Sequence, residues 1–269
     1  MRPARPSAKN GRRPVAVLVV LVGLMAACVT QAYAQDTATA SAAPLWSGAM
    51  GVGRTSNAIG AAGEQSIMLR RVTDRGSVAL EALQFRRLGQ NDRAWALDAY
   101  PRLWDGAYSN VRLQQAPHAR LYPGTSWRAE IYQGVGQGWE LAASHDELGF
   151  DTPIHIEGVA VGKYWGNFYA RWRHQEVRSK GSTGQGDRFM LRYYYQGDAD
   201  HFVEANASSG RSDDFATTLL TPSRSDARGW SWLHFFNREW GLKASWSESK
   251  DNSSGGRERS FNLGATHRW

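Results

Sequence analysis

The feature that most constrains this chain is a period of two. Apolar and polar side chains alternate in short segments along most of its length. Side chains at alternate positions of a β-strand lie on opposite faces of the sheet. The alternation therefore predicts an all-β fold built from amphipathic strands. In segment 166–178 the two faces are Phe168, Ala170 and Trp172 on one side and Tyr169, Arg171 and Arg173 on the other.

Turn signals such as Asp105-Gly106, Gly197-Asp198 and Gly255-Gly256 separate these segments. Regularly spaced strands with polar connections predict an antiparallel meander. We expect about 14 strands, or 12 if the first and eleventh do not form. The candidate strands are 45–55, 65–72, 77–87, 94–104, 106–115, 126–135, 138–147, 153–164, 166–178, 186–196, 200–209, 228–237, 239–249 and 257–269.

Two segments do not alternate cleanly. Glu81 shares a face with Leu83 and Phe85, and segment 228–236 carries bulky side chains on both faces. Bulges or strand ends would explain both irregularities.

The first 34 residues predict a cleavable export signal. Arg2, Arg5, Lys9, Arg12 and Arg13 precede the apolar run Val15–Val29, and Ala32-Tyr33-Ala34 fits a cleavage site. The run is shorter than the ~20 residues that a spanning helix needs. Residues 35–44 then form a flexible leader, and residues 45–269 form one domain. Cys28, the only cysteine, lies inside the signal. Its lipidation is an alternative, because Leu24–Cys28 loosely resembles a lipobox.

The net charge of the whole chain is misleading. Five of the 32 Lys and Arg residues lie in the signal, which leaves 27 basic residues against 25 acidic ones. The sequence pI of about 9.7 is therefore poor support for nucleic-acid binding, and no nucleic-acid partner is expected.

The alternation fits a water-soluble sandwich or a membrane barrel, and the aromatic residues favour the barrel. The chain has 12 Trp and 10 Tyr. Trp104, Trp127, Trp139 and Trp165 fall near segment ends, where an interfacial girdle needs them. An Arg or Lys turned toward lipid would cost about 2–4 kcal/mol at the bilayer midplane, so the charged faces must line the lumen. We predict a transmembrane antiparallel up-and-down β-barrel that contacts outer-membrane lipid.

The segment Asn262–Trp269 fits the signal by which assembly machinery recognises a final barrel strand. The pattern is polar-x-Gly-x-x-aromatic-x-aromatic, and its residues here are Asn262, Gly264, His267 and Trp269. The β-barrel assembly machinery is therefore an expected partner. The predicted outward row is Phe261, Leu263, Ala265, His267 and Trp269. Such a strand must pair with the first strand to leave no open edge in lipid.

Four phrases in order resemble the YaiO family of outer-membrane β-barrels. They are "LDAYPRLWDGAYSNV" (97–111), "LYPGTSWRAEIYQGVGQGWELAAS" (121–144), "VGKYWGNFYARWR" (161–173) and "RYYYQGDADHFVE" (192–204). The resemblance runs from about Gly48 to the C-terminus and implies a barrel in the bacterial outer membrane. Family members are associated with envelope polysaccharide systems. The chain departs from the family pattern at 204–214 and at His267, where Phe or Tyr is commoner.

The inward charges and tyrosines are the candidate functional residues. The predicted lumen-lining set is Asp98, Tyr100, Arg102, Arg128, Glu130, Tyr132, Lys163, Arg171, Arg173, Arg188, Arg192, Tyr194 and Lys243. These residues could bind an envelope polysaccharide or another small polar solute and assist its export, with tyrosines stacking on sugars. The alternative is a plug of salt bridges that stabilises the barrel. A barrel of 12 or 14 strands lies between the eight-stranded size that side chains fill and the 16-stranded size that leaves an open channel. Strand number therefore does not decide between the two alternatives.

Two other functions stay open: an outer-membrane lipid or glycan hydrolase, and a purely structural or receptor barrel. Ser144, His145, Asp146 and Glu147 form the best local cluster for a hydrolase, but adjacent strand residues face opposite ways. The seven histidines show no metal-binding spacing, so no metal and no cofactor are expected. Two pairs of acids, Asp198 with Asp200 and Asp213 with Asp214, are expected to be solvated turn acids and not Ca²⁺ sites.

Overall fold

The structure is a computed structural model that describes residues 45–57, 60–213, 222–252 and 255–269. The predicted signal, the leader and Cys28 lie outside the described residues. Within them, no helix has the length and hydrophobicity to cross a bilayer. The described strands are β1 (Trp46–Asn57), β2 (Gly60–Thr73), β3 (Gly76–Arg87), β4 (Gln90–Trp104), β5 (Ala107–Gln115), β6 (Thr125–Gly136), β7 (Trp139–Gly149), β8 (Ile154–Trp165), β9 (Phe168–Ser179), β10 (Ser182–Tyr194), β11 (His201–Asp213), β12 (Pro222–Phe235), β13 (Trp240–Asp251) and β14 (Arg257–Arg268).

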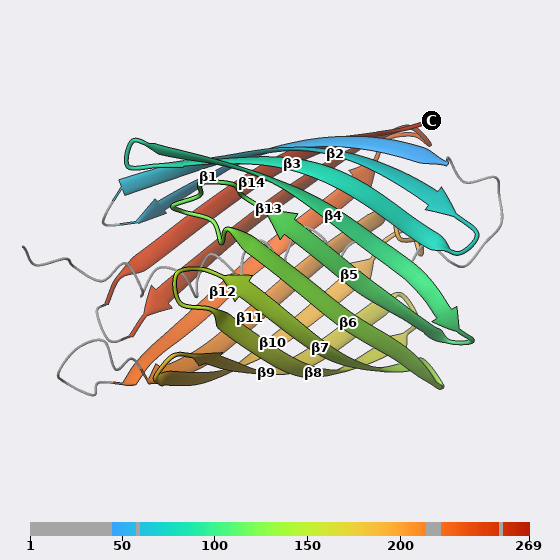
Figure 1. Ribbon diagram of the computed structural model, residues 1–269. Coiled ribbons are helices and arrows are strands. Elements are labelled where there is room, and N and C mark those ends of the chain that lie inside the picture. Colours follow the sequence, from blue (N-terminus) through green and yellow to red (C-terminus); the bar gives the residue numbers. More distant parts are fainter. Residues whose placement is uncertain (1–44, 58–59, 214–221, 253–254) are drawn as a thin grey trace, which may run out of the picture. The chain divides into compact units, whose positions relative to one another are not determined.

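The 14 strands form one closed antiparallel barrel in which each strand pairs with its neighbours in sequence (Figure 1). β14 closes the barrel on β1, with a ladder from Ser47↔Arg268 to Asn57↔Glu258. Beyond this ladder the backbone N–H groups of Trp46 and Trp269 each donate to the carbonyl of the other, at 3.2 and 3.1 Å. Closure leaves no strand edge exposed, which confirms the predicted barrel and the pairing of its last strand with its first.

Large apolar side chains form a continuous band on the outer face. Their exposed fractions are high because no second sheet or helix covers them, as in barrels whose outer face contacts hydrocarbon. Ile67 and Met50, for example, are 67% and 66% exposed. Other members of the band are Val52, Leu69, Val78, Leu80, Leu97, Val111, Leu113, Ile131, Leu141, Val159, Leu191, Val203 and Leu263.

Aromatic side chains mark both limits of this band. At one limit lie the exposed residues Trp104, Trp139, Trp165, Phe168, Phe236, Trp240 and Trp269. His267 continues this row, since its ring lies 4.4 Å from that of Trp240 and 5.4 Å from that of Trp269. The outward row predicted for β14 is thus observed.

At the other limit the outer face changes from aromatic to charged within two residues. Trp246 pairs with Trp230 and Phe261 across three strands. The next outward row holds Glu248, which contacts Arg228 at 3.2 Å and Arg259 at 2.8 Å. Such a row belongs in the polar interface, because charges on the lipid face are costly.

The two ends of the barrel differ in their connections. Connections of two to six residues join strands at the end that holds Trp46 and Trp269, here called the short-turn end. The opposite end, here called the long-loop end, includes the connection 116–124 between β5 and β6. Several short turns use glycine with positive φ, and a Cβ on Gly138 (φ +78) would lie 2.5 Å from the carbonyl oxygen of Tyr164.

The strand number agrees with the sequence prediction, but some strands are longer. β2 starts at Gly60 and not at 65, β10 at Ser182 and not at 186, and β12 at Pro222 and not at 228. These extensions lie at the long-loop end, beyond the apolar band, and their sequences consist mainly of small and polar residues. Alternation disappears there although the hydrogen-bonded ladders continue.

Candidate functional site

Charged side chains of both signs line the inner face from β3 to β11 and pair with one another. Arg112 on β5 contacts Glu81 on β3 at 2.7 Å and Asp98 on β4 at 3.1 Å. On the far side, Arg192 contacts Glu204 at 2.6 Å. These pairs join several strands into a wall that we call the charged arc. It comprises Glu81, Asp98, Arg112, Arg128, Glu130, Glu140, Asp146, Arg171, Arg173, Arg192 and Glu204.

Glu130 on β6 is the centre of the charged arc and is 2% exposed. Its carboxylate accepts a hydrogen bond from the Tyr132 hydroxyl at 2.7 Å and from the Arg171 guanidinium. Arg173 lies 3.7 Å from Glu130 and 3.9 Å from Asp146, and so links β6 and β7. A buried charge is tolerated where partners and hydrogen bonds surround it, as they do here.

Two glycines on β8 give the charged arc its geometry. A Cβ on Gly158 would lie 3.2 Å from Nε of Arg173, and one on Gly162 would lie 2.7 Å from the Tyr169 hydroxyl. Arg173 and Tyr169 belong to β9 but pass over these positions. Tyr169 thereby donates to Glu140 on β7 at 2.8 Å. Glycine is thus needed where side chains of β9 cross β8.

At mid-height the opposite inner wall carries mainly small, uncharged side chains, although Lys243 of β13 also lies on this inner face. Its residues at mid-height are partly exposed, whereas most of those in the charged arc are buried. Ser66 and Asn262 lie across glycines of β1, since a Cβ on Gly51 would meet Oγ of Ser66 and a Cβ on Gly53 would meet Oδ1 of Asn262. The side chains of Ser66 and Asn262 therefore lie flat along the wall, over β1. We call this surface the small-residue wall: Gly51, Gly53, Ser66, Asn206, Ser208, Ser245, Ser247, Asn262 and Gly264.

The connection 116–124 folds inward at the long-loop end. Asp92 on β4 holds it, because one carboxylate oxygen accepts the backbone N–H groups of Arg120, Leu121 and Tyr122 at 2.8, 2.5 and 3.0 Å. Burial raises the pKa of Tyr122, so its phenol stays neutral and lies 3.4 Å from Glu64.

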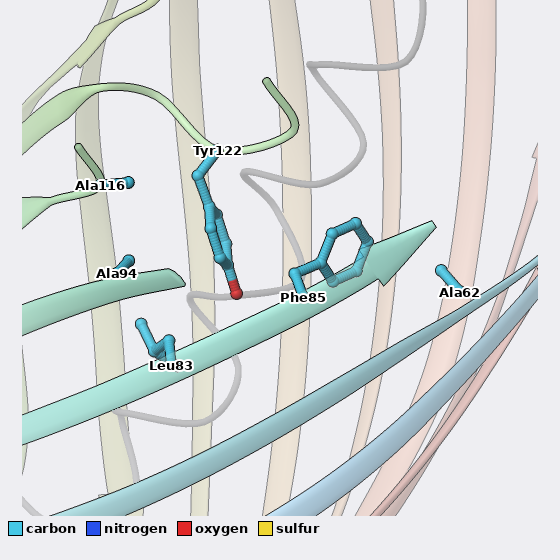
Figure 2. Close-up of a cluster of buried hydrophobic side chains, with 6 residues drawn as sticks. All are labelled: Ala62, Leu83, Phe85, Ala94, Ala116 and Tyr122. Atoms are coloured by element: carbon cyan, nitrogen blue, oxygen red, sulfur yellow. The ribbon is translucent and has the colours of Figure 1, made fainter. Parts of the chain in front are cut away.

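Figure 2 shows Tyr122 descending from this connection toward side chains on the inner face of the neighbouring strands. The ring centroids of Tyr122 and Phe85 lie 5.7 Å apart. Leu83 and Phe85 therefore face inward beside Glu81 without a bulge, because the connection covers them. The buried cluster is Ala62, Leu83, Phe85, Ala94, Ala116 and Tyr122.

Most of the predicted lumen-lining residues lie on the inner face. They are Asp98, Tyr100, Arg128, Glu130, Tyr132, Arg171, Arg173, Arg188, Arg192, Tyr194 and Lys243. Arg102 pairs with Tyr108 beside the β4–β5 bulge and is exposed at the short-turn end. Tyr132 is 5% exposed and stacks on Tyr108 at 4.4 Å, so its ring face is already covered.

Lys163 was predicted to line the lumen, and that prediction is wrong, because Lys163 lies on the outer face. It shares its side of β8 with Val159 and Val161, and its ammonium lies 4.7 Å from the ring centroid of Trp139. The ammonium also donates to the backbone carbonyl of Gln137 in the adjacent turn. At the edge of the band a lysine can keep its stem on apolar surface and its charge in the polar interface, so residue type alone misplaced it.

Several members of the charged arc were not among the predicted site residues. They are Glu81, Arg112, Glu140, Asp146 and Glu204. Each occupies an inward position of a predicted strand. Counting alternate positions from an inward neighbour, such as Asp146 from Ser144, would have found them.

The cluster at 144–147 is divided between the two faces of β7. Ser144 and Asp146 face the lumen, where Ser144 accepts a hydrogen bond from Arg173 at 2.6 Å. His145 and Glu147 face outward, beside Trp127. Ser144 and His145 are therefore not placed to act as nucleophile and base for each other.

The acids at 198 and 200 are held by basic side chains at the short-turn end. Asp198 accepts from His201 at 2.7 Å, and Asp200 receives two hydrogen bonds from Arg268, both at 2.7 Å. Arg268 also lies 3.7 Å from the ring centroid of Phe235. The contact between Asp200 and Arg268 attaches the 195–200 turn to β14. Asp214 lies outside the described residues.

The chain matches the family model of the YaiO membrane β-barrel domain over residues 54–215. No curated protein sequence matches it. Its fold is similar to the COG4313 outer membrane channel of Pseudomonas putida F1, with a TM-score of 0.56, 10% identity and coverage of 87% of this chain and 98% of that chain. It is also similar to a bacterial polysaccharide outer membrane secretin, with a TM-score of 0.55, 10% identity and coverage of 85% of this chain and 100% of that chain. A third similar structure is the translocator domain of autotransporter NalP from Neisseria meningitidis. Its TM-score is 0.50 and its identity 12%, with coverage of 94% of this chain and 98% of that chain. At these identities the likeness concerns the fold alone.

Proposed function

Because the chain belongs to the YaiO family and is a bacterial outer-membrane β-barrel, we propose that it binds and passes a saccharide through its lumen. The ligand is an envelope polysaccharide or a smaller polar sugar. It follows the small-residue wall, while the charged arc fills the opposite side. The unequal lining of the two walls carries this proposal.

The packing of the charged arc supports the proposal, because its large side chains lie against one another and leave space on the opposite side of the lumen. Glu130, Asp98 and Arg192 are 2%, 4% and 4% exposed, so large side chains there pack against one another. The small-residue wall faces them with glycine, serine and asparagine. A 14-stranded barrel is wider than the eight-stranded size that side chains fill, and a path beside the small residues is the space that remains.

The chemistry of the small-residue wall suits a sugar. Ser245, Ser247 and Asn262 offer hydroxyl and amide groups that can exchange hydrogen bonds with sugar hydroxyls without a net charge. The charged arc is paired internally, so it places no excess of one sign beside the path. The likeness in fold to a polysaccharide outer membrane secretin agrees with this ligand class.

The proposal is tested by ion current through the purified, refolded protein in a planar bilayer. Stable conductance is expected, and added maltoheptaose should reduce it in a concentration-dependent manner. An oligo-uronate of similar length should block less at equal concentration, because the residues of the small-residue wall are polar and uncharged. A barrel that carries no current, or a current that neither sugar changes, would contradict a saccharide path.

A further inference from the structure

The outer face at the long-loop end carries a cluster of side chains that the saccharide path does not use. His145 and Glu147 are two residues apart on β7, and both face outward. Register sets His155 of β8 opposite Glu147, and Glu157 opposite His145. Two imidazoles and two carboxylates therefore occupy the corners of one small rectangle on the barrel surface.

From this arrangement we propose that His145, His155 and Glu147 bind a divalent transition-metal ion, with Zn²⁺ the best match. One ligand atom from each of the three residues lies within 4.8 Å of the other two. Tetrahedral zinc, with bonds of about 2.0–2.2 Å, needs ligand atoms about 3.3–3.6 Å apart. Rotation of these exposed and partly exposed side chains covers the difference, because the backbone register already sets the three residues together.

Neighbouring groups are placed to orient the ligands. The indole N–H of Trp127 donates to Glu147 at 3.1 Å, which positions that carboxylate. Nδ1 of His145 lies 3.9 Å from Glu157, so Glu157 can steady the ring and leave the other nitrogen for the ion. Carboxylates and other acceptors commonly support metal-bound histidines in this way.

The ligand types select the class of metal. Imidazole nitrogen suits Zn²⁺, Cu²⁺ and Ni²⁺, whereas Ca²⁺ and Mg²⁺ prefer sites built from oxygen alone. Glu157 lies 3.5 Å from Arg178 and so is already partly neutralised. Glu147, which has the indole as its neighbour, is the main carboxylate ligand. Three protein ligands leave one position for water.

The test uses tag-free, full-length protein, refolded in detergent and stripped with EDTA, so that no polyhistidine competes. Titration with Zn²⁺ by calorimetry should give one site per chain. Co²⁺ should give the visible absorption bands of a tetrahedral nitrogen and oxygen site. His145→Ala and His155→Ala should each weaken Zn²⁺ binding by at least about tenfold.

His174→Ala is the matched control, because His174 is also outward but pairs with Asp187 at 3.1 Å on neighbouring strands. It should leave the affinity unchanged. Heat-modifiable migration on gels shows that each variant is folded, and His155→Gln replaces any His155→Ala protein that is not. Absence of Zn²⁺ binding by the folded protein, or binding that survives both histidine substitutions, overturns the site.

Discussion

Glu130 shows how single residues hold the lumen wall together. It is surrounded by Tyr132, Arg171 and Arg173, which supply hydrogen bonds and positive charge from two strands. Water hardly reaches it. Removing such a carboxylate leaves two guanidinium groups without their main counter-charge, and that is more costly than the loss of an exposed ion pair.

Glu130→Ala should therefore lower the free energy of unfolding by about 3–5 kcal/mol. Urea titration of the protein in lipid vesicles, followed by tryptophan fluorescence, measures this value. Glu176→Ala is the control, since Glu176 and its partner Arg178 have side chains that are 52% and 57% exposed. The control should change the free energy by less than about 1 kcal/mol. Equal losses in the two variants would show that the charged arc is not a buried network.

For single residues, the sequence predicted which face of the barrel a side chain occupies better than it predicted which residues that side chain contacts. Alternation correctly set Tyr169, Arg171 and Arg173 inward, because the period of two decides the face. It failed for Lys163, where charge type was given more weight than position. It could not show that Arg173 reaches Asp146 two strands away, because that contact depends on barrel curvature and on a glycine in the strand between.

Among the elements, β8 acts as a spacer. Its inward positions include Gly158, Ala160 and Gly162, which are small enough for side chains of β9 to lie over them. The contacts of Tyr169 with Glu140 and of Arg173 with Asp146 depend on this gap. A larger residue in β8 should separate β9 from β7 although every backbone ladder stays intact.

Gly162→Val should lower the free energy of unfolding by about 1–3 kcal/mol, the usual cost of overpacking. The cause is local, so truncation of Tyr169 should relieve it. A double-mutant cycle with Tyr169→Ala measures the coupling by urea titration. We expect the double variant to be more stable than the sum of the single losses predicts. Strict additivity would mean that the two residues do not compete for space.

Strand number was the most predictable property of the elements, and strand length the least. All 14 predicted segments appear as strands, since each crosses the apolar band and alternates there. Their extensions at the long-loop end carry no alternation, so nothing in segments such as 182–185 indicates a strand. The inward fold of 116–124 was also beyond prediction, because it is held by a single carboxylate, Asp92 of β4, which lies 28 to 30 residues earlier in the chain.

For the whole molecule, the unequal lining of the lumen is the central feature. The charged arc fills one side of the lumen with paired side chains. On the other side, the side chains of the small-residue wall are small and offer hydroxyl and amide groups. The connection 116–124 reduces the opening near β2 to β4. Solutes are therefore expected to pass close to β13, β14 and β1.

Single-channel conductance of Ser245→Trp, compared with Ala244→Trp, tests this claim most directly. Residues 245 and 244 are adjacent on β13, but the first faces the lumen and the second faces lipid. An indole at 245 should lower the conductance by about half or more, because a side chain of that size fills a narrow path. Ala244→Trp should leave the conductance unchanged. Equal conductance of Ser245→Trp and the unaltered protein would contradict a path along the small-residue wall.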